Sequence, residues 1–312
     1  MTAPAKLLVG LIGAGIQRSL TPAMHETEAR AQGLALHYQL IDLDATGQGV
    51  EALPTLISAA RTMGFAGLNV TYPCKQAVIP LLDGLSDEAE AMGAVNTIVF
   101  ERGAAGRAVR AVGHNTDGSG WRWGFERTLP GADLSRVVLL GAGGAGSAIA
   151  HALLRMDTRA LVLVDADPAR AAAAAERLNA IYPGRRASHA ADAAAALAAH
   201  SAQAAQAAQA AQGGTGRATG LVHATPTGMD KLPGLPLPAA LLRPDLWVSE
   251  IVYFPLQTEL LKAAGAAGCA VCDGGTMAVG QAVGAFRLFT GCEPDPARMD
   301  AHFRSMVARR TH

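Results

Sequence analysis

Short apolar runs alternate along the chain with longer segments of mixed polarity, a pattern that predicts strands alternating with helices. The runs lie at 7–13, 38–43, 67–71, 93–99, 137–140, 160–164, 221–228 and 247–253, the seventh ending in a polar turn. Helical segments follow most of them, for example 53–63 and 121–129. This order predicts an α/β fold with parallel or mostly parallel sheets, whose ligands gather beyond the carboxyl ends of the strands.

One run leads straight into a glycine-rich turn. Val137–Leu140 is followed by Gly141-Ala142-Gly143-Gly144-Ala145-Gly146, and a helical segment starts at Ser147. In the Gly-x-Gly-x-x-Gly fingerprint of dinucleotide-binding units, the first glycine forms the tight turn, the second admits a pyrophosphate, and the third lets the helix pack on the strand. The alternative is a glycine-rich turn that binds no nucleotide.

The next apolar run ends on Asp165. A carboxylate at this position can accept hydrogen bonds from both hydroxyls of an adenosine ribose. A 2′-phosphate would instead meet a like charge and lack a basic partner. The sequence therefore predicts NAD, with NADP less expected.

Composition excludes several other functions. Lys+Arg and Asp+Glu both number 26, so the formal net charge is zero, and aromatic residues make up 4%. Neither nucleic acid nor an anionic membrane surface is expected to bind through bulk charge. The apolar runs are shorter than a membrane span and the N-terminal run lacks the features of a signal peptide, so we expect a cytoplasmic protein. Cys269 and Cys272 form a Cys-x-x-Cys, but residues three apart on a strand point to opposite faces, so no metal site is expected.

Candidate chemistry lies at the strand ends of the first 120 residues. Lys75, Asn96, Asn115 and Asp117 all lie at or just after apolar runs, and parallel strands end at a common edge. Taken alone, Lys75 is compatible with a solvated lysine at a helix start and Asp117 with a turn-forming aspartate. Two hydroxyls, Ser19 and Thr21, precede Pro22 at a predicted helix start, where they either cap the helix or form an anion site.

Several motifs in this order resemble the shikimate dehydrogenase family over essentially the whole chain, and most closely its bacterial NAD-dependent quinate/shikimate dehydrogenases. The motifs are Ser19–Pro22, Asn69–Lys75, Gly93–Thr97, Asn115–Gly118, Gly141–Gly146, Ala224–Pro226, and Asp273-Gly274 with Gln281. The resemblance implies reversible oxidation of the C3 hydroxyl of quinate or shikimate. It also implies two α/β domains with the substrate in the cleft between them: a substrate domain at 1–118, completed by 276–312, and a Rossmann NAD-binding domain at 119–275.

The resemblance further implies roles for single residues. Lys75 and Asp117 match the catalytic pair, and an amine oriented by a carboxylate can take up the hydroxyl proton or return it. Ser19 and Thr21 match the hydroxyls that hold the substrate carboxylate. Other substrate contacts are expected from Thr71, Asn96, Asn115, Tyr253 and Gln281. Cofactor contacts are expected from Gly141, Ala142, Gly143, Gly144, Ala145, Gly146, Asp165, Arg170, Thr225, Pro226, Val252, Gly274 and Met277.

Some residues depart from the family pattern. Thr21 stands where biosynthetic members commonly have serine, and Asp165 stands where NADP-preferring members carry Asn-Arg-Thr, so both favour the NAD-linked branch. Cys74 replaces a larger residue beside Lys75. The alanine-rich segment 191–212 is expected to be a solvent-facing helical extension without an assigned function, and His25 and His114 are expected to be structural.

Three alternatives remain open at this stage. They are an NADP-linked biosynthetic shikimate dehydrogenase, an aminoshikimate-type relative with another ring substrate, and a non-catalytic nucleotide or metabolite sensor. A monomer and a homodimer are equally compatible with the sequence.

Overall fold

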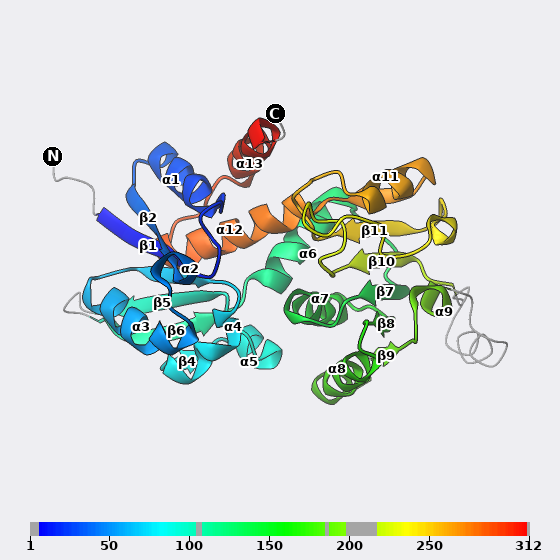
Figure 1. Ribbon diagram of the computed structural model, residues 1–312, viewed down its shortest axis with the longest axis horizontal. Coiled ribbons are helices and arrows are strands. Elements are labelled where there is room, and N and C mark those ends of the chain that lie inside the picture. Colours follow the sequence, from blue (N-terminus) through cyan, green and yellow to red (C-terminus); the bar gives the residue numbers. More distant parts are fainter. Residues whose placement is uncertain (1–5, 104–107, 185–186, 198–216, 311–312) are drawn as a thin grey trace. The chain divides into compact units, whose positions relative to one another are not determined.

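The computed structural model describes residues 6–103, 108–184, 187–197 and 217–310. Its contacts divide the chain into two compact units, the first made of Met1–Gly120 with Val279–His312 and the second of Trp121–Ala278. Each unit is built on a six-stranded sheet with helices beside it (Figure 1). The predicted α/β fold is confirmed.

The first sheet has the strand order β2-β1-β3-β5-β6-β4 and is mixed. Its strands are β1 (Lys6–Gly13), β2 (Ala35–Asp42), β3 (Gly67–Val70), β4 (Gly84–Leu85), β5 (Thr97–Arg102) and β6 (Ala108–His114). β5 runs antiparallel to both β3 and β6, whereas the other pairs are parallel. Two antiparallel pairings in succession restore the direction of β1, so the carboxyl ends of β1, β3 and β6 share one edge with the amino end of β5.

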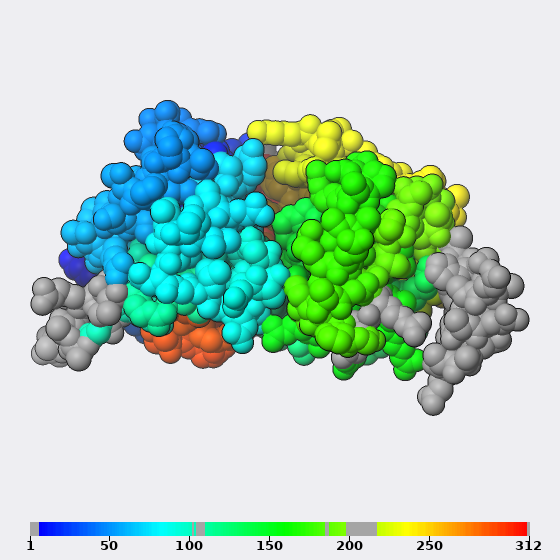
Figure 2. Space-filling model, turned by 90° about the horizontal axis from the view of Figure 1, so that it is seen from below, coloured from blue at the N-terminus to red at the C-terminus, as the bar shows by residue number. Residues whose placement is uncertain are grey.

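Helices pack on both faces of this sheet. On one face lie α3 (Leu53–Thr62), α4 (Cys74–Ala77) and α5 (Asp87–Met92), which appear blue to cyan in Figure 2, and their side chains join Ile12 and Leu68 in one cluster. On the other face, α1 (Thr21–Ala31) and α12 (Gly274–Thr290) lie beside Val9 and Leu11. Because side chains alternate along a strand, β1 supplies both clusters. The remaining elements of this unit are α2 (Leu43–Thr46), η1 (Val50–Ala52), η2 (Ile79–Leu81) and α13 (Pro296–Arg310).

The second sheet is entirely parallel, in the order β12-β11-β10-β7-β8-β9. Its strands are β7 (Arg136–Leu140), β8 (Ala160–Val164), β9 (Ala187–His189), β10 (Gly220–His223), β11 (Trp247–Glu250) and β12 (Ala270–Cys272). Every residue of β7 and β10 is buried. Strands covered on both faces need apolar residues at successive positions, which explains the unbroken apolar runs in the sequence.

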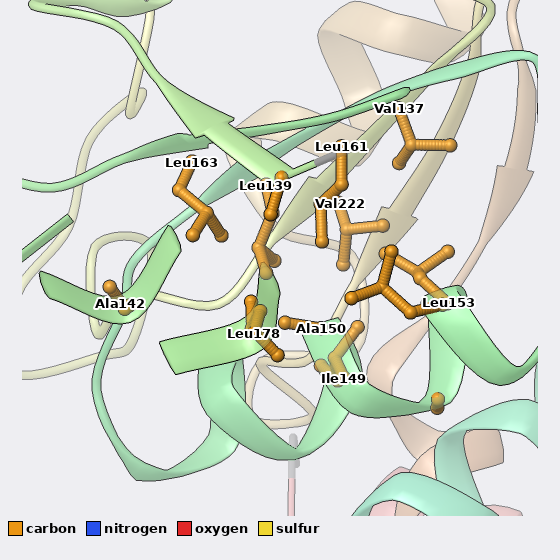
Figure 3. Close-up of a cluster of buried hydrophobic side chains, with 14 of the residues drawn as sticks. Val137, Leu139, Ala142, Ile149, Ala150, Leu153, Leu161, Leu163, Leu178 and Val222 are labelled. Atoms are coloured by element: carbon orange, nitrogen blue, oxygen red, sulfur yellow. The ribbon is translucent and has the colours of Figure 1, made fainter. Parts of the chain in front are cut away.

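The core of the second unit lies on both faces of this sheet. Leu139 and Leu161 pack against Ile149 and Leu153 of α7 (Gly144–Arg155) and against Leu178 of α8 (Pro168–Ile181), as Figure 3 shows. The opposite face packs against α9 (Ala193–Leu197) and α11 (Glu259–Ala266). The unit also contains η3 (Ala239–Leu241) and part of α6 (Asp117–Thr128).

The alanine-rich segment differs from the prediction where it is described. α9 spans only Ala193–Leu197, and Ala196 and Leu197 are buried in the core instead of facing solvent. The guanidinium of Arg136 donates to the carbonyl of Ala196 at 3.3 Å, which ties α9 to β7. The rest of the predicted extension, 198–212, lies outside the described residues.

Two further findings concern membranes and metals. Within the described part of the chain, each helix is too short or too polar to traverse a bilayer. The described His, Cys, Asp and Glu residues form no group of three or more that could hold a metal ion. Cys269 and Cys272, at either end of the short β12 segment, are both free thiols.

Candidate active site

The shared edge of the first sheet gathers most of the predicted polar residues. Thr71 follows β3, and Asn115 follows β6. The sequence predicts Asn96 inside a strand at 93–99, but β5 begins after it, at Thr97. Asn96 reaches this edge because β5 runs antiparallel to its neighbours.

Lys75 and Asp117, which are 42 residues apart in the sequence, form an ion pair at this edge. Lys75 Nζ donates to Asp117 Oδ2 at 2.6 Å. The lysine side chain is 28% exposed, whereas that of the aspartate is only 4% exposed. The sequence predicts Asp117 in a polar loop, but it is the first residue of α6, where the helix dipole favours a carboxylate. A buried carboxylate thus holds an amine that still reaches solvent.

Two amide side chains hold Asp117 in turn. Asn96 Nδ2 donates to Asp117 Oδ1 at 2.9 Å and to Thr116 Oγ1 at 3.0 Å, and its Oδ1 accepts the Thr116 N–H at 2.8 Å. Asn115 Oδ1 accepts the Asp117 N–H at 2.9 Å, and its Nδ2 donates to the Ala94 carbonyl. Both amides are buried. They therefore orient the carboxylate, while their predicted contact with a substrate stays a prediction.

The segment that starts α1 carries the two predicted hydroxyls. The N-cap residue is Leu20, whose side chain makes no capping hydrogen bond. Ser19 Oγ instead accepts the N–H of Thr21 at 3.3 Å. Neither Ser19 nor Thr21 is the N-cap residue, although Ser19 bonds the first N–H of the helix. The anion site stays a prediction.

Asp42, at the end of β2, was missed in the sequence and organises the loop that leads to Ser19. Its carboxylate accepts hydrogen bonds from the N–H groups of Gly15 and Ile16 and from Gln17 Nε2, at 2.9–3.1 Å. Burial acts to raise the pKa of Asp42, but these hydrogen bonds outweigh it and leave the pKa below its usual value. The sequence did offer a signal for Asp42. It is an acidic residue at the end of an alternating strand, with a glycine-rich turn elsewhere in the same unit.

The remaining substrate candidates lie in different places. Thr71 accepts the Cys74 N–H through its carbonyl, at 2.8 Å, which fixes the start of α4 beside Lys75. Gln281 of α12 lies against α6, because a Cβ added to Gly120 would be only 2.5 Å from the Gln281 nitrogen. Tyr253 belongs to the second unit, where it is 44% exposed.

The glycine turn of the second unit has the geometry that its sequence predicts. Gly141 has a φ of 97°, which other residues rarely adopt. A Cβ on Gly146 would lie 1.9 Å from the Gly141 carbonyl, whereas a Cβ on Gly143 or Gly144 would point into open space. α7 begins after Gly143 without a capping side chain among the described residues. The turn therefore forms a cradle in which N–H groups can receive a phosphate, and it fits a dinucleotide.

The surroundings of Asp165 overturn one premise of the sequence analysis. Its carboxylate accepts the Ala142 N–H at 2.8 Å and the Asp167 N–H at 2.9 Å, and it pairs with the Arg170 guanidinium at 3.2 Å. A basic partner is therefore present beside Asp165. Arg170 also lies 3.9 Å from the Asp167 carboxylate, so two acids share one cation.

The other predicted cofactor residues lie near the carboxyl ends of neighbouring strands. The methyl group of Thr225 is 3.0 Å from the position that a Cβ on Gly141 would take. A Cβ on Gly274 would lie 2.4 Å from the carbonyl oxygens of Ile251 and Val252. Met277 is buried in the core, and Pro226 is exposed. Their contact with a cofactor stays a prediction.

Sequence reasoning assigned no role to His223 or Glu250. They end the adjacent strands β10 and β11 and form a fully buried pair, with His223 Nδ1 2.9 Å from Glu250 Oε1. The signal in the sequence was an ionisable residue at the end of each of two buried apolar strands.

Several known proteins are similar to this chain. The pattern described as "Shikimate dehydrogenase substrate binding domain" matches residues 11–98. The protein named shikimate dehydrogenase (NADP(+)) of Streptomyces avermitilis is 56% identical over 300 residues, which cover 96% of each chain. The chain belongs to the shikimate dehydrogenase family.

The proteins similar to this chain include some named for NAD and others named for NADP. Quinate/shikimate dehydrogenase (NAD(+)) of Corynebacterium efficiens is 46% identical over 96% of this chain and 98% of its own length. The solved structure of quinate dehydrogenase from Corynebacterium glutamicum in complex with NAD has a TM-score of 0.81 and 46% identity, over 96% of this chain and 100% of that one. Similarity to the family therefore does not distinguish NAD from NADP.

Proposed function

We propose that this chain is a dehydrogenase that reversibly oxidises the C3 hydroxyl of quinate, of shikimate or of both, with NAD as the preferred cofactor. The ion pair of Lys75 and Asp117 at the strand ends of the first unit carries this proposal. The relative at 56% identity is named shikimate dehydrogenase (NADP(+)), and one at 46% is named quinate/shikimate dehydrogenase (NAD(+)). In this proposal residues 1–118 and 276–312 bind the substrate, and 119–275 bind the dinucleotide.

The residues of the first unit supply the proton chemistry. Residues 141–146 and Asp165 would hold a nicotinamide dinucleotide, which would supply the acceptor for the hydride on the carbon that bears the alcohol. The hydroxyl proton must leave at the same time, and Lys75 Nζ in its amine form takes it, so that the carbonyl and an ammonium group result. In the reverse direction the ammonium returns the proton to the carbonyl oxygen. Asp117 keeps the amine aligned in both directions, and Asn96 and Asn115 keep Asp117 in place.

The substrate carboxylate needs an anion site. We assign it to the hydroxyls of Ser19 and Thr21, which flank the N-cap residue Leu20. Asp42 fixes the preceding loop through its bonds to Gly15, Ile16 and Gln17, and so limits the positions that Ser19 can take. Thr71, Asn96, Asn115, Gln281 and Tyr253 are proposed as contacts of the ring substituents.

The charges beside the ribose position support NAD. Arg170 is the kind of side chain that accommodates a 2′-phosphate in NADP-linked relatives of this fold. Here, however, it pairs with Asp165 and also approaches Asp167, so the three side chains together carry one net negative charge. A phosphate would have to displace a carboxylate from the guanidinium, whereas ribose hydroxyls can donate to Asp165.

One experiment tests the reaction and the cofactor together. The intact chain is assayed by the absorbance of the reduced nicotinamide with quinate or shikimate, each against NAD and NADP. We expect turnover with at least one of the two acids, and a higher kcat/KM with NAD than with NADP. Higher kcat/KM with NADP would overturn the cofactor assignment and favour the NADP-linked alternative. Dinucleotide binding without turnover of either acid would overturn the proposed reaction and favour a sensor.

A further inference from the structure

His223 and Glu250, the buried pair at the ends of β10 and β11, make side-chain hydrogen bonds in addition to the pairing of the two strands. His223 and Glu250 are register partners in the parallel pair, and their side chains are fully buried. His223 Nδ1 lies 2.9 Å and 3.1 Å from the two carboxylate oxygens of Glu250. A carboxylate only accepts hydrogen bonds, so Nδ1 carries a proton. Burying such a pair is costly unless all its polar atoms are bonded.

Glu250 also accepts hydrogen bonds from the segment that follows β11. Its Oε1 accepts the N–H groups of Ile251 at 2.8 Å and Val252 at 3.0 Å, and its Oε2 accepts the Thr258 hydroxyl at 3.0 Å. Thr258 in turn caps α11. One carboxylate therefore fixes both ends of the segment 251–258, which contains two proposed ligand contacts, Val252 and Tyr253.

The other ring nitrogen of His223, Nε2, contacts Thr225. Nε2 lies within hydrogen-bonding distance of Thr225 Oγ1, which also accepts a long bond from the Thr227 N–H at 3.4 Å. The methyl group of Thr225 lies against Gly141 of the glycine turn. Because the hydroxyl and the methyl group each have a fixed neighbour, Thr225 has one preferred rotamer. Thr225 itself is only partly buried.

We propose that His223 and Glu250 are positioning residues for the dinucleotide, acting through the hydroxyl of Thr225. With the imidazole neutral and its proton on Nδ1, Nε2 accepts the Thr225 O–H, so the threonine oxygen faces the ligand as an acceptor. It then recognises a donor of the cofactor, either a ribose hydroxyl or the nicotinamide carboxamide. The inference rests on the proposed use of a nicotinamide dinucleotide.

Equilibrium binding of NADH to the intact chain, followed by its fluorescence, tests this without requiring turnover. Thr225→Val keeps the shape but removes the hydroxyl, and we expect it to raise the Kd about three- to tenfold. Thr225→Ser should restore most of the affinity. His223→Leu should raise the Kd by a similar factor, whereas His151→Leu should leave it unchanged. His151 is the matched control, since it is a buried histidine of the same unit that bonds to Tyr182.

The double variant His223→Leu/Thr225→Val separates positioning from general support of the fold. If His223 acts through the Thr225 hydroxyl, the double variant should bind NADH no more weakly than Thr225→Val alone, because the effects are not additive. A wild-type Kd in Thr225→Val, or multiplied effects in the double variant, would overturn this inference and leave the proposed function intact. A wild-type chain that binds neither NADH nor NADPH would overturn both. The threonine variants keep the test decisive if His223→Leu does not fold.

Discussion

Asp117 connects the other polar residues of the candidate site in the first unit. One oxygen receives Lys75 and the other receives Asn96, while its own N–H donates to Asn115. A buried polar network of this kind is rigid when all its members are bonded. The position of the Lys75 amine therefore depends on residues that are far apart in the sequence, and Asp117 connects them.

The charge balance at Asp165 gives a prediction about the cofactor. The double variant Asp165→Ser/Ala166→Arg removes one carboxylate that occupies Arg170 and adds a second cation. We expect the ratio of kcat/KM for NADP to that for NAD to rise about tenfold or more, because a 2′-phosphate then meets two guanidinium groups. Asp300→Ser, which removes a carboxylate of α13 in the other unit, is the control. An unchanged ratio would show that Asp165 does not contact the ribose.

His25 gives a prediction about stability and pH. Its ring is buried among Tyr38, Phe286 and Phe289, and neither ring nitrogen has a hydrogen-bond partner among the described residues. Burial lowers the pKa of His25 from 6.5 to about 3. The folded pKa is depressed, so the unfolded chain takes up the proton first, and stability falls as the pH drops from 6.5 towards 3.

At about pH 5 this linkage should cost the folded first unit about 2 kcal/mol relative to neutral pH. His25→Phe keeps an aromatic ring in the site and removes the titrating group. In urea unfolding at about pH 8 and about pH 5, the advantage of the variant over the wild type should therefore grow by that amount at the lower pH. An equal difference at both pH values would contradict the assignment.

Among the elements, α6 and α12 approach each other closely at small residues. A Cβ on Gly120 would lie 2.5 Å from the Gln281 nitrogen, and a Cβ on Gly280 would lie 2.2 Å from the Gly120 carbonyl. Both neighbours are backbone atoms, which cannot move without moving a helix. The helix that starts at Asp117 is thereby held against the helix that carries Gln281.

Gly120→Ala should therefore force α6 away from α12. We expect a loss of about 1–3 kcal/mol in unfolding free energy, as for other overpacked sites, together with reduced turnover because Asp117 shifts. Gly265→Ala is the matched control, since this exposed glycine of α11 has nothing within 4 Å of an added Cβ. It should be neutral or slightly stabilising. Equal behaviour of the two variants in thermal unfolding and kcat would contradict the packing argument.

The elements also show why strand positions were predictable and strand direction was less so. Strands such as β7 are buried on both faces, and burial leaves a direct trace in the sequence. Strand direction depends instead on the connections. Only five residues separate β5 from β6, too few for the crossover that a parallel pair needs. The antiparallel pairing, and with it the position of Asn96, could have been inferred from that spacing.

Across the whole molecule, the candidate catalytic residues were easier to predict from the sequence than the hydrogen-bond networks that position the site residues. Lys75 and Asp117 were predictable because strand ends meet at one edge of a sheet, and the structure pairs them. Asp42, His223 and Glu250 were missed, because hydrogen bonds between residues far apart in the sequence leave no periodic signal, and only their positions at strand ends marked them. The sequence analysis also missed the cation beside Asp165. Arg170 reaches this carboxylate only because the chain turns back towards it at the start of α8.

The two units divide the proposed reaction into separable parts. The pair of Lys75 and Asp117, proposed to carry the proton chemistry, belongs to the first unit, and the glycine turn belongs to the second. A change at Lys75 should therefore affect turnover and leave dinucleotide binding unaffected.

The most direct test is the kcat of Lys75→Met with shikimate or quinate, measured beside its Kd for NADH. Methionine has a similar length but no proton to exchange. We predict that kcat falls by about 10²–10⁴-fold while the Kd stays at the wild-type value. A variant that turns over at the wild-type rate would show that Lys75 does not transfer the proton.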